Sequence, residues 1–193
     1  MKYLHGFKIT LLLFILCIPL VVFTQDESKR QTAINFVNAV NEKRFADAES
    51  LTIDSFVVRT IYGGKDRKKA PYFLSLKNKT PLNQVLKIDS TSVKDKYVRL
   101  YVTSSSDLVK YIGVPELPLT YTFLYENEKI LELQIDSLRG YNALMAKNDR
   151  RWNAFENWAK IQYPGINVTY IKLQYADSLS SLIRQYKTDI NKK

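Results

Sequence analysis

The side chains that could carry acid–base chemistry in this sequence are mainly carboxylates, lysines and tyrosines. The chain has one histidine, His5, and one cysteine, Cys17, and both lie within the first 24 residues. If that segment is removed, the remaining chain has no residue for a thiolate nucleophile, a Cys/His zinc site, a disulfide or a Ser-His-Asp triad. We therefore expect no metal ion and no cofactor, and a fold that depends on its hydrophobic core alone.

Three carboxylates are candidates for proton transfer: Asp54, Glu132 and Asp136. Asp54 precedes a stretch with helical spacing, so we interpret it as a helix N-cap and not as a base with a raised pKa. Glu132 and Asp136 alternate with apolar residues, which places them on the polar face of a predicted strand. We expect them to meet solvent or a second subunit, and we assign no catalytic residue.

Aromatic side chains offer a different chemistry, the binding of a small molecule. Tyr121, Phe123 and Tyr125 share one face of a predicted strand. Two phenolic hydroxyls on such a face are polar anchors for a ligand if a cavity lies beside them, and core residues if it does not. With Leu100 and Phe36 these three residues form the predicted pocket lining.

The first 24 residues have the features of a secretory signal peptide. Lys2 and Lys8 make a basic start, and an uncharged apolar run follows over 10–23. This run has about 14 residues, fewer than the ~20 that span a bilayer core. We expect cleavage before Gln25 and export to the periplasm or the exterior. One alternative is that residues 10–23 stay uncleaved and anchor the protein in a membrane; without that anchor we expect no membrane partner. The other alternative is lipidation at Cys17.

The charge balance is basic. The chain has 29 Lys and Arg against 19 Asp and Glu, a net charge of +10 that falls to +8 without Lys2 and Lys8. The charges are scattered apart from the stretch 65–69, so we interpret them as a solvated surface and expect no nucleic-acid partner.

The elements that must position these residues begin with helices. Apolar side chains recur every three to four residues over 27–41, at Ala33, Phe36, Val37 and Val40. The same spacing predicts a second helix over 44–51. A third helix is predicted over 55–62, ended by Gly63.

From residue 82 the period changes to two, which is typical of half-buried strands. Four such runs predict an antiparallel meander whose last two strands join at a tight turn over 126–129. The predicted inner face carries Val98, Leu100, Val102, Tyr121, Phe123, Tyr125, Leu131, Leu133 and Ile135. The predicted outer face carries Arg99, Thr120, Thr122, Glu132 and Gln134, with Arg99 and Glu132 as a cross-sheet pair if their strands are neighbours.

Helical spacing returns after the strands, over 141–159 and again from Asp177. We expect loops at 65–69 and 104–118. Helices, then strands, then helices indicate an α+β fold in which a curved antiparallel sheet wraps the N-terminal helices. We expect one domain over 25–193, with a C-terminal helical extension from about residue 138.

Four segments give this order a family resemblance: Ala33 to Val37, Glu42 to Ala48, Phe123 to Ile130 and Trp158 to Pro164. Together they resemble the nuclear transport factor 2-like superfamily, which includes polyketide cyclase-like and ketosteroid isomerase-like members, over roughly 28–190. The resemblance implies a cone-shaped α+β barrel with a pocket between sheet and helices, and often a homodimer through the outer sheet face. It does not imply an activity.

Three functions follow as competing hypotheses. The first is an exported, non-catalytic protein that binds a small apolar or amphipathic ligand in the cone. The second is an isomerase or hydrolase that uses a carboxylate in the pocket. The third is an interaction module that uses the outer sheet face.

Overall fold

A computed structural model of the chain describes residues 25–60, 65–94, 97–138, 140–168 and 176–192. The predicted signal segment and Gly63 lie outside these ranges. Within them, no helix is both long enough and apolar enough to cross a membrane. After an N-terminal helix over 25–41, the elements are α2 (Phe45–Ser50), β1 (Thr52–Thr60), β2 (Arg67–Lys68), α3 (Lys69–Lys79), η1 (Thr80–Leu82), β3 (Val85–Lys94), β4 (Tyr97–Ser105), η2 (Leu108–Ile112), β5 (Leu117–Glu126), β6 (Lys129–Ser137), α4 (Tyr141–Gln162) and α6 (Ala176–Ile190).

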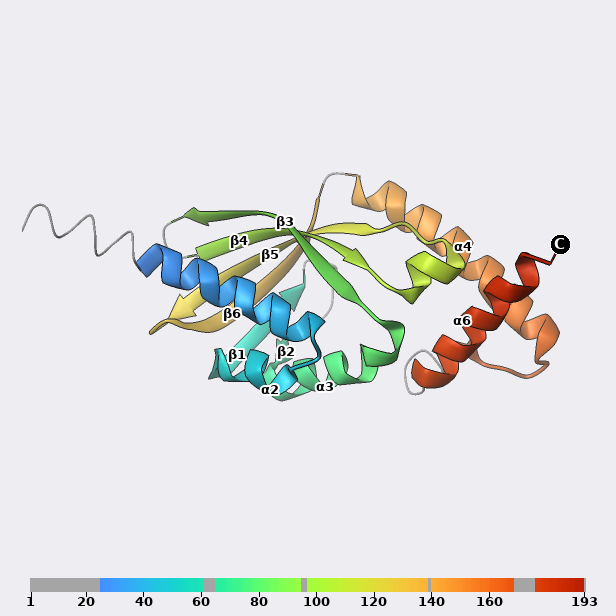
Figure 1. Cartoon of the computed structure of the whole chain (residues 1–193), viewed down its shortest axis with the longest axis horizontal. Helices are drawn as coiled ribbons and strands as arrows, with labels where there is room; N and C mark the ends of the chain where they lie inside the picture. Colours follow the sequence, from blue (N-terminus) through green and yellow to red (C-terminus); the bar gives the residue numbers. More distant parts are fainter. Residues whose placement is uncertain (1–24, 61–64, 95–96, 139, 169–175, 193) are drawn as a thin grey trace, which may run out of the picture.

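Six strands form one open, mixed sheet in the order β2-β1-β6-β5-β4-β3. Strands β3 to β6 make the predicted antiparallel meander, and β1 joins it parallel to β6. The N-terminal helix, α2 and α3 lie against one face of this sheet (Figure 1). The chain therefore has the predicted α+β fold, in which helices cover the concave side of a sheet whose edges stay open.

The predicted register is confirmed for β4 and β5 and needs one correction in β6. Val98 pairs with Phe123, and Phe123 with Leu133, so these three buried side chains cross the inner face in one row. A shift between Leu124 and Tyr125 then makes Ile130 the partner of Tyr125. The prediction that Leu131 lies on the inner face is wrong, because this β-bulge inserts one residue and reverses the alternation.

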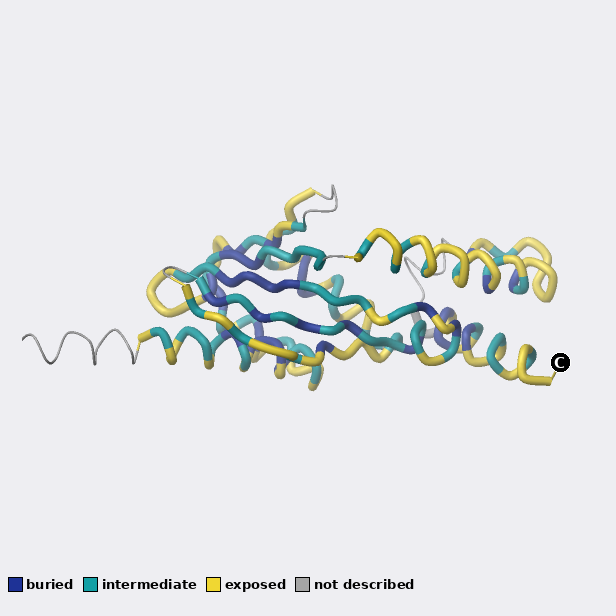
Figure 2. The backbone as a smooth tube through the Cα atoms, turned by 90° about the horizontal axis from the view of Figure 1, so that it is seen from above, coloured by how far each residue is buried: buried dark blue, intermediate teal, exposed yellow. Residues whose placement is uncertain are grey.

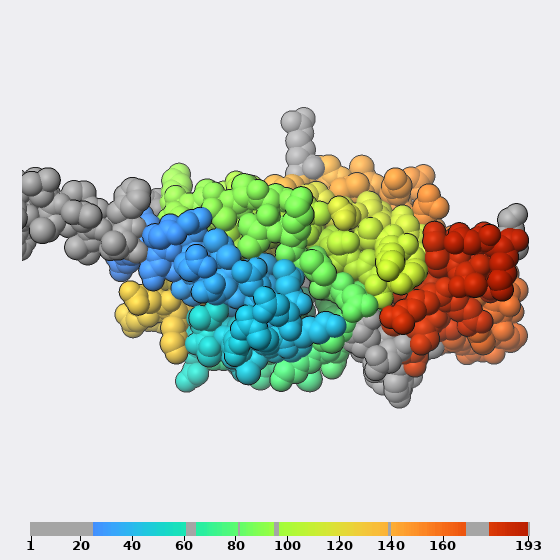
Figure 3. Space-filling model, viewed as in Figure 1, coloured from blue at the N-terminus to red at the C-terminus, as the bar shows by residue number. Residues whose placement is uncertain are grey.

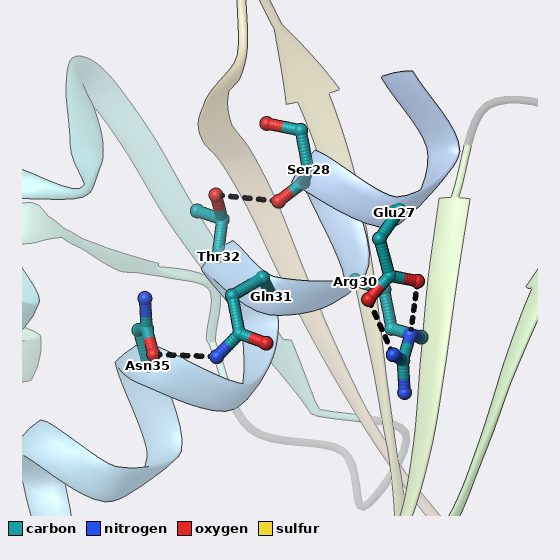
Figure 4. A network of polar contacts seen from close by, with 6 residues as sticks. All are labelled: Glu27, Ser28, Arg30, Gln31, Thr32 and Asn35. Carbon is teal, nitrogen blue, oxygen red and sulfur yellow. Dashed lines mark hydrogen bonds and ion pairs between the residues drawn. The ribbon is translucent and has the colours of Figure 1, made fainter. Parts of the chain in front are cut away.

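The N-terminal helix confirms its predicted apolar stripe. Ala33, Phe36 and Val37 are almost fully buried, and the ring of Phe36 packs edge-on against that of Phe123. The opposite face of the helix is polar (Figure 4). There Arg30 pairs with Glu27, Gln31 donates to Asn35 at 2.9 Å and the Thr32 hydroxyl donates to the Ser28 carbonyl at 3.0 Å. The helix is amphipathic, and its packed side forms one wall of the core.

Two expectations for residues 52–69 are wrong. The segment predicted as a helix over 55–62 is largely strand β1, which buries Phe56 and Val58 against the core. Pairing with β6 overrides a pattern that is locally compatible with a helix. Asp54 consequently caps no helix; it lies exposed within β1, 3.7 Å from the Lys69 ammonium group. The stretch 65–69 is not all loop either, since Arg67 and Lys68 pair with β1 and α3 begins at Lys69.

The stretch 104–118 also contains more structure than a loop. β4 extends to Ser105, η2 is a single π-helical turn, and β5 begins at Leu117. The turn ends at Gly113, whose φ of 75° is the left-handed conformation that glycine adopts without strain. Ile112 and Val114 from this stretch are buried outside the space between the sheet and the N-terminal helices, which we call the cone.

A second hydrophobic core lies beyond the sheet, between η2, α4 and α6. Its most buried members on the helices are Phe155, Ala159, Leu179 and Ile183. The rings of Trp152, Trp158 and Tyr186 surround Phe155 at centroid distances of 5.4 to 6.0 Å. Figure 2 shows α4 and α6 reaching past the end of the sheet. The described chain therefore contains two packed clusters, one inside the cone and one in the C-terminal helices.

The outer sheet face carries the predicted polar residues, but Arg99 and Glu132 do not pair with each other as predicted. Glu132 contacts Arg59 at 3.2 Å and accepts a hydrogen bond from Gln134 at 2.6 Å. Arg99 is not its partner, because β5 separates their strands; Arg99 instead donates to the Thr122 hydroxyl at 3.4 Å. The use of this face as a dimer interface stays a prediction.

Candidate ligand-binding pocket

A cavity of about 90 Å³ opens where α3 meets the inner face of the sheet. That volume holds several water molecules but is well below the ~300–1,000 Å³ of sites for drug-sized ligands. Figure 3 shows the side of the molecule on which the N-terminal helix (blue) adjoins the segment from α3 to β3 (green). The lining residues are Val40, Lys43, Phe45, Arg67, Tyr72, Ser75, Leu76, Lys79, Thr80, Gln84, Leu86, Tyr121 and Ile135.

Two tyrosines line this cavity from opposite walls. Tyr72 comes from α3 and Tyr121 from β5, and both are at least 95% buried. Neither hydroxyl donates a hydrogen bond to another described residue, whereas buried phenols normally have a partner. Burial raises the pKa of Tyr121 to about 12 and that of Tyr72 further, with the nearby Arg67 guanidinium opposing both shifts. Both hydroxyls are therefore protonated donors throughout the physiological pH range.

Arg67 supplies one of the positive charges that line the pocket. In the register of β2 it lies opposite Val58, a buried residue of the inner face, so its side chain turns toward the cone. One of its terminal nitrogens donates to the Ser75 hydroxyl at 3.2 Å, and that hydroxyl donates to the Tyr72 carbonyl at 2.8 Å. Arg67 is thus held half-buried beside the tyrosine rings by a short hydrogen-bonded chain through α3.

A side-chain clamp fixes the wall that faces α3. The Asn41 amide donates to the Leu86 carbonyl at 2.9 Å and accepts from the Leu86 backbone N–H at 2.8 Å. Asn41 thereby substitutes for a neighbouring strand at the start of β3 and joins it to the end of the N-terminal helix. Val40 and Lys43, on either side of Asn41, are held at the cavity in this way.

The five residues predicted to line a pocket occupy different places. Tyr121 lines the cavity. Phe36, Leu100 and Phe123 are almost fully buried among other core side chains and are not among the cavity lining. The Tyr125 hydroxyl donates to the Lys29 carbonyl at 2.7 Å, at the start of the N-terminal helix. Ligand binding by any of the five stays a prediction.

Arg67 and Tyr72 are the most consequential of the lining residues that the sequence does not predict. Arg67 lies in a run of charged residues that suggests a solvated loop, and its strand has only two residues. Tyr72 and Phe73 are adjacent apolar residues on a helix of weak amphipathicity, so no periodic signal marks them. Pro71 in the first turn was the available signal, since proline is favoured at a helix start.

The three carboxylates weighed for catalysis lie away from this cavity. Asp54 is exposed, and Glu132 and Asp136 belong to the outer face. One oxygen of Asp136 is buried without a hydrogen-bond partner. Burial raises the pKa of Asp136, and the charge of Arg99 opposes that shift. Among the described residues, the ionisable groups at the cavity are therefore cations and phenols.

Comparison with solved structures identifies the architecture. The chain is similar to an LEH-like epoxide hydrolase from M. tuberculosis with a TM-score of 0.53 and 14% identity, over 67% of this chain and 95% of that one. It is also similar to a candidate ketosteroid isomerase from Kribbella flavida with a TM-score of 0.52 and 11% identity, over 60% and 82% of the two chains. The fold is nuclear transport factor 2-like.

A third nuclear transport factor 2-like match is a candidate polyketide cyclase from Xanthomonas campestris, with a TM-score of 0.51 and 11% identity over 64% and 98% of the two chains. No protein-family model and no curated protein matches the sequence. At these identities the likeness is one of fold, and it carries no activity to this chain. Each of the three matches leaves about a third of this chain or more outside the shared fold.

Proposed function

We propose that this chain is an exported, non-catalytic protein that binds a small amphipathic molecule in the cavity between α3 and the sheet. The observation that carries the proposal is the mixed lining. Val40, Phe45 and Leu86 line the same cavity as Tyr72 and Tyr121, whose phenolic hydroxyls have no partner among the described residues. A few convergent polar groups in an otherwise apolar cavity are typical of small-molecule sites.

The chemistry of the lining supports binding over proton transfer. A general base must be able to accept a proton near neutral pH. Tyr72 and Tyr121 have raised pKa values, so they remain protonated there and act only as hydrogen-bond donors. Isomerisation or hydrolysis through a carboxylate would need an acidic side chain at the cavity, and Asp54, Glu132 and Asp136 lie elsewhere.

The binding proposal is tested by filling the cavity. Leu76 lines it from α3, whereas Leu74 on the same helix is 59% exposed. Leu76→Trp places a large ring in the cavity, and Leu74→Trp makes the same change on the surface. Titration with butanamide and with butanoate, followed by amide chemical shifts, should give shifts at the lining residues that Leu76→Trp abolishes and Leu74→Trp keeps. Equal titration curves in both variants and the unaltered protein would refute the pocket.

Export is supported by the sequence pattern of the first 24 residues. Intact-mass analysis of protein recovered outside the cytoplasm should show a chain that begins at Gln25. Retention of Met1 would instead indicate a membrane anchor, and a lipid-modified Cys17 would indicate a lipoprotein.

A further inference from the structure

The cavity contains a guanidinium group that no carboxylate of the described residues balances. Among the described residues, Arg67 forms no ion pair, and the hydrogen bond of its side chain goes to the neutral Ser75 hydroxyl. Asp66 is adjacent in sequence, but its carboxylate lies 3.7 Å from Arg59. An arginine keeps its charge at every physiological pH, and a half-buried charge without a counter-ion destabilises the folded chain.

The groups around Arg67, like Arg67 itself, favour a negatively charged ligand. Tyr72 and Tyr121 present O–H donors, and both are close enough for the charge of Arg67 to act on them. Lys43 and Lys79 extend the basic lining toward the N-terminal helix and the end of α3. No acidic side chain of the described residues lines the cavity. Every charged group at the site is therefore a cation.

We propose that the molecule held in this pocket carries a carboxylate, and that the Arg67 guanidinium binds it with the Tyr72 and Tyr121 hydroxyls as additional donors. A planar guanidinium matches a carboxylate through two parallel N–H···O bonds. This inference rests on the proposed function and specifies the chemical class of its ligand.

The apolar part of the lining indicates the chemistry of the remainder of the ligand. Val40, Leu76 and Leu86 contribute apolar side chains to the same lining as the two tyrosines. An aliphatic stem on the carboxylate is removed from water there, and the small volume limits the enclosed part to a short chain. The pocket thus fits a short-chain monocarboxylic acid.

The test compares two probes of the same shape. Butanoate and butanamide have planar head groups of equal size and differ in charge. We expect butanoate to bind the unaltered protein at least tenfold more tightly than butanamide. Arg67→Gln should remove that preference by weakening butanoate binding at least tenfold, with little effect on butanamide.

Lys68→Gln is the matched control, because Lys68 is the exposed neighbour of Arg67 on β2 and loses the same charge. It should keep the preference for butanoate, which excludes a general effect of net charge. Arg67→Lys retains the charge without the two-pronged geometry and should lose several-fold in butanoate affinity. That variant decides the matter if Arg67→Gln does not fold.

The outcomes separate the two proposals. Equal affinity for butanoate and butanamide, or full preference in Arg67→Gln or Arg67→Lys, overturns the carboxylate assignment and leaves the pocket in place. Absence of binding by both probes, or binding that survives Leu76→Trp, overturns the pocket itself.

Discussion

Tyr121 and Tyr125 lie four positions apart on the same face of β5, yet their hydroxyls have different surroundings. Tyr125 donates to the Lys29 carbonyl at 2.7 Å, which attaches the last part of β5 to the start of the N-terminal helix. The Tyr121 hydroxyl lies at the cavity without a partner among the described residues. The first hydroxyl is therefore structural, and the second is available for a ligand.

Removing these two hydroxyls should have opposite effects. Tyr125→Phe should lower the free energy of unfolding by about 1 kcal/mol, the usual contribution of one hydrogen bond, and leave butanoate binding unchanged. Tyr121→Phe should change stability by less than about 0.5 kcal/mol and weaken butanoate binding. Urea unfolding and amide-shift titration measure the two quantities, and equal losses of stability would contradict this division.

Alkaline pH should destabilise the fold through the buried tyrosines. An unperturbed tyrosine has a pKa of about 10, whereas burial raises the pKa of Tyr121 to about 12 and also raises that of Tyr72. Below about pH 10 both states keep these protons, so their contribution to stability is fully present there. Above it the unfolded chain loses them first. Stability should then fall by about 1.4 kcal/mol per pH unit for each such tyrosine, until the folded-state pKa is passed.

Urea midpoints at about pH 8 and about pH 11 check this slope. Tyr121→Phe should make the decline shallower. A midpoint that stays constant across that interval would mean that the tyrosines ionise equally in the folded and unfolded chains.

The turn between β5 and β6 stores strain that a single substitution relieves. Asn127 and Glu128 have φ values of 48° and 65°, the pattern of a type I′ turn, in which the second position favours glycine. Glu128→Gly should stabilise the protein by about 1 kcal/mol, since a β-carbon is disfavoured in this conformation. Glu126→Gly makes the same change within β5 and should destabilise by about 0.5–1 kcal/mol. Thermal unfolding of the pair measures both, and a loss of stability in Glu128→Gly would contradict the turn type.

The two faces of β5 should differ sharply in their tolerance of truncation. Phe123 is fully buried and packs against Phe36, so Phe123→Ala should lower the free energy of unfolding by about 3–5 kcal/mol. Thr122→Ala on the outer face loses a long hydrogen bond from Arg99 and should cost about 1 kcal/mol or less. Denaturant midpoints decide; a larger loss for Thr122→Ala would reverse the register.

The strands differ in how well the sequence predicts them. The alternation in β4 and β5 predicts which side chains are inside, because each strand has a polar and an apolar face. The sequence pattern of β1 predicts a helix, because its parallel partner β6 is about 75 residues distant in sequence and no local pattern encodes that pairing. The alternation in β5 predicts the place of Tyr121. Arg67 reaches the pocket because the two residues of β2 pair with β1, and the charged run around it gives no sign of a strand.

At the scale of the molecule, two hydrophobic clusters divide the described chain. The cone contains Phe36, Phe56 and Phe123, and the C-terminal cluster centres on Phe155. α6 packs against η1 and η2, so the second cluster is attached near the end of the cone where the cavity lies. This arrangement allows the C-terminal helices to lose structure without opening the cone.

Phe155→Ala should reveal that independence. It should accelerate amide hydrogen exchange in η2, α4 and α6, because a large buried ring is removed from their shared core. Protection in β4, β5 and β6 should remain as in the unaltered protein. Mass-spectrometric exchange resolves these segments, and a uniform loss of protection across the chain would show that the clusters unfold as one unit.

The bond from Tyr125 to Lys29 joins residues 96 positions apart, and the N-terminal helix packs throughout against strands that follow it in the chain. A ribosome adding about 5–20 residues per second needs roughly 5 to 20 seconds to make that intervening length. During this interval the apolar stripe of the helix has no sheet to cover it. The nascent chain therefore cannot complete this core until β5 has been made, and an incompletely folded chain is the form that the proposed export requires.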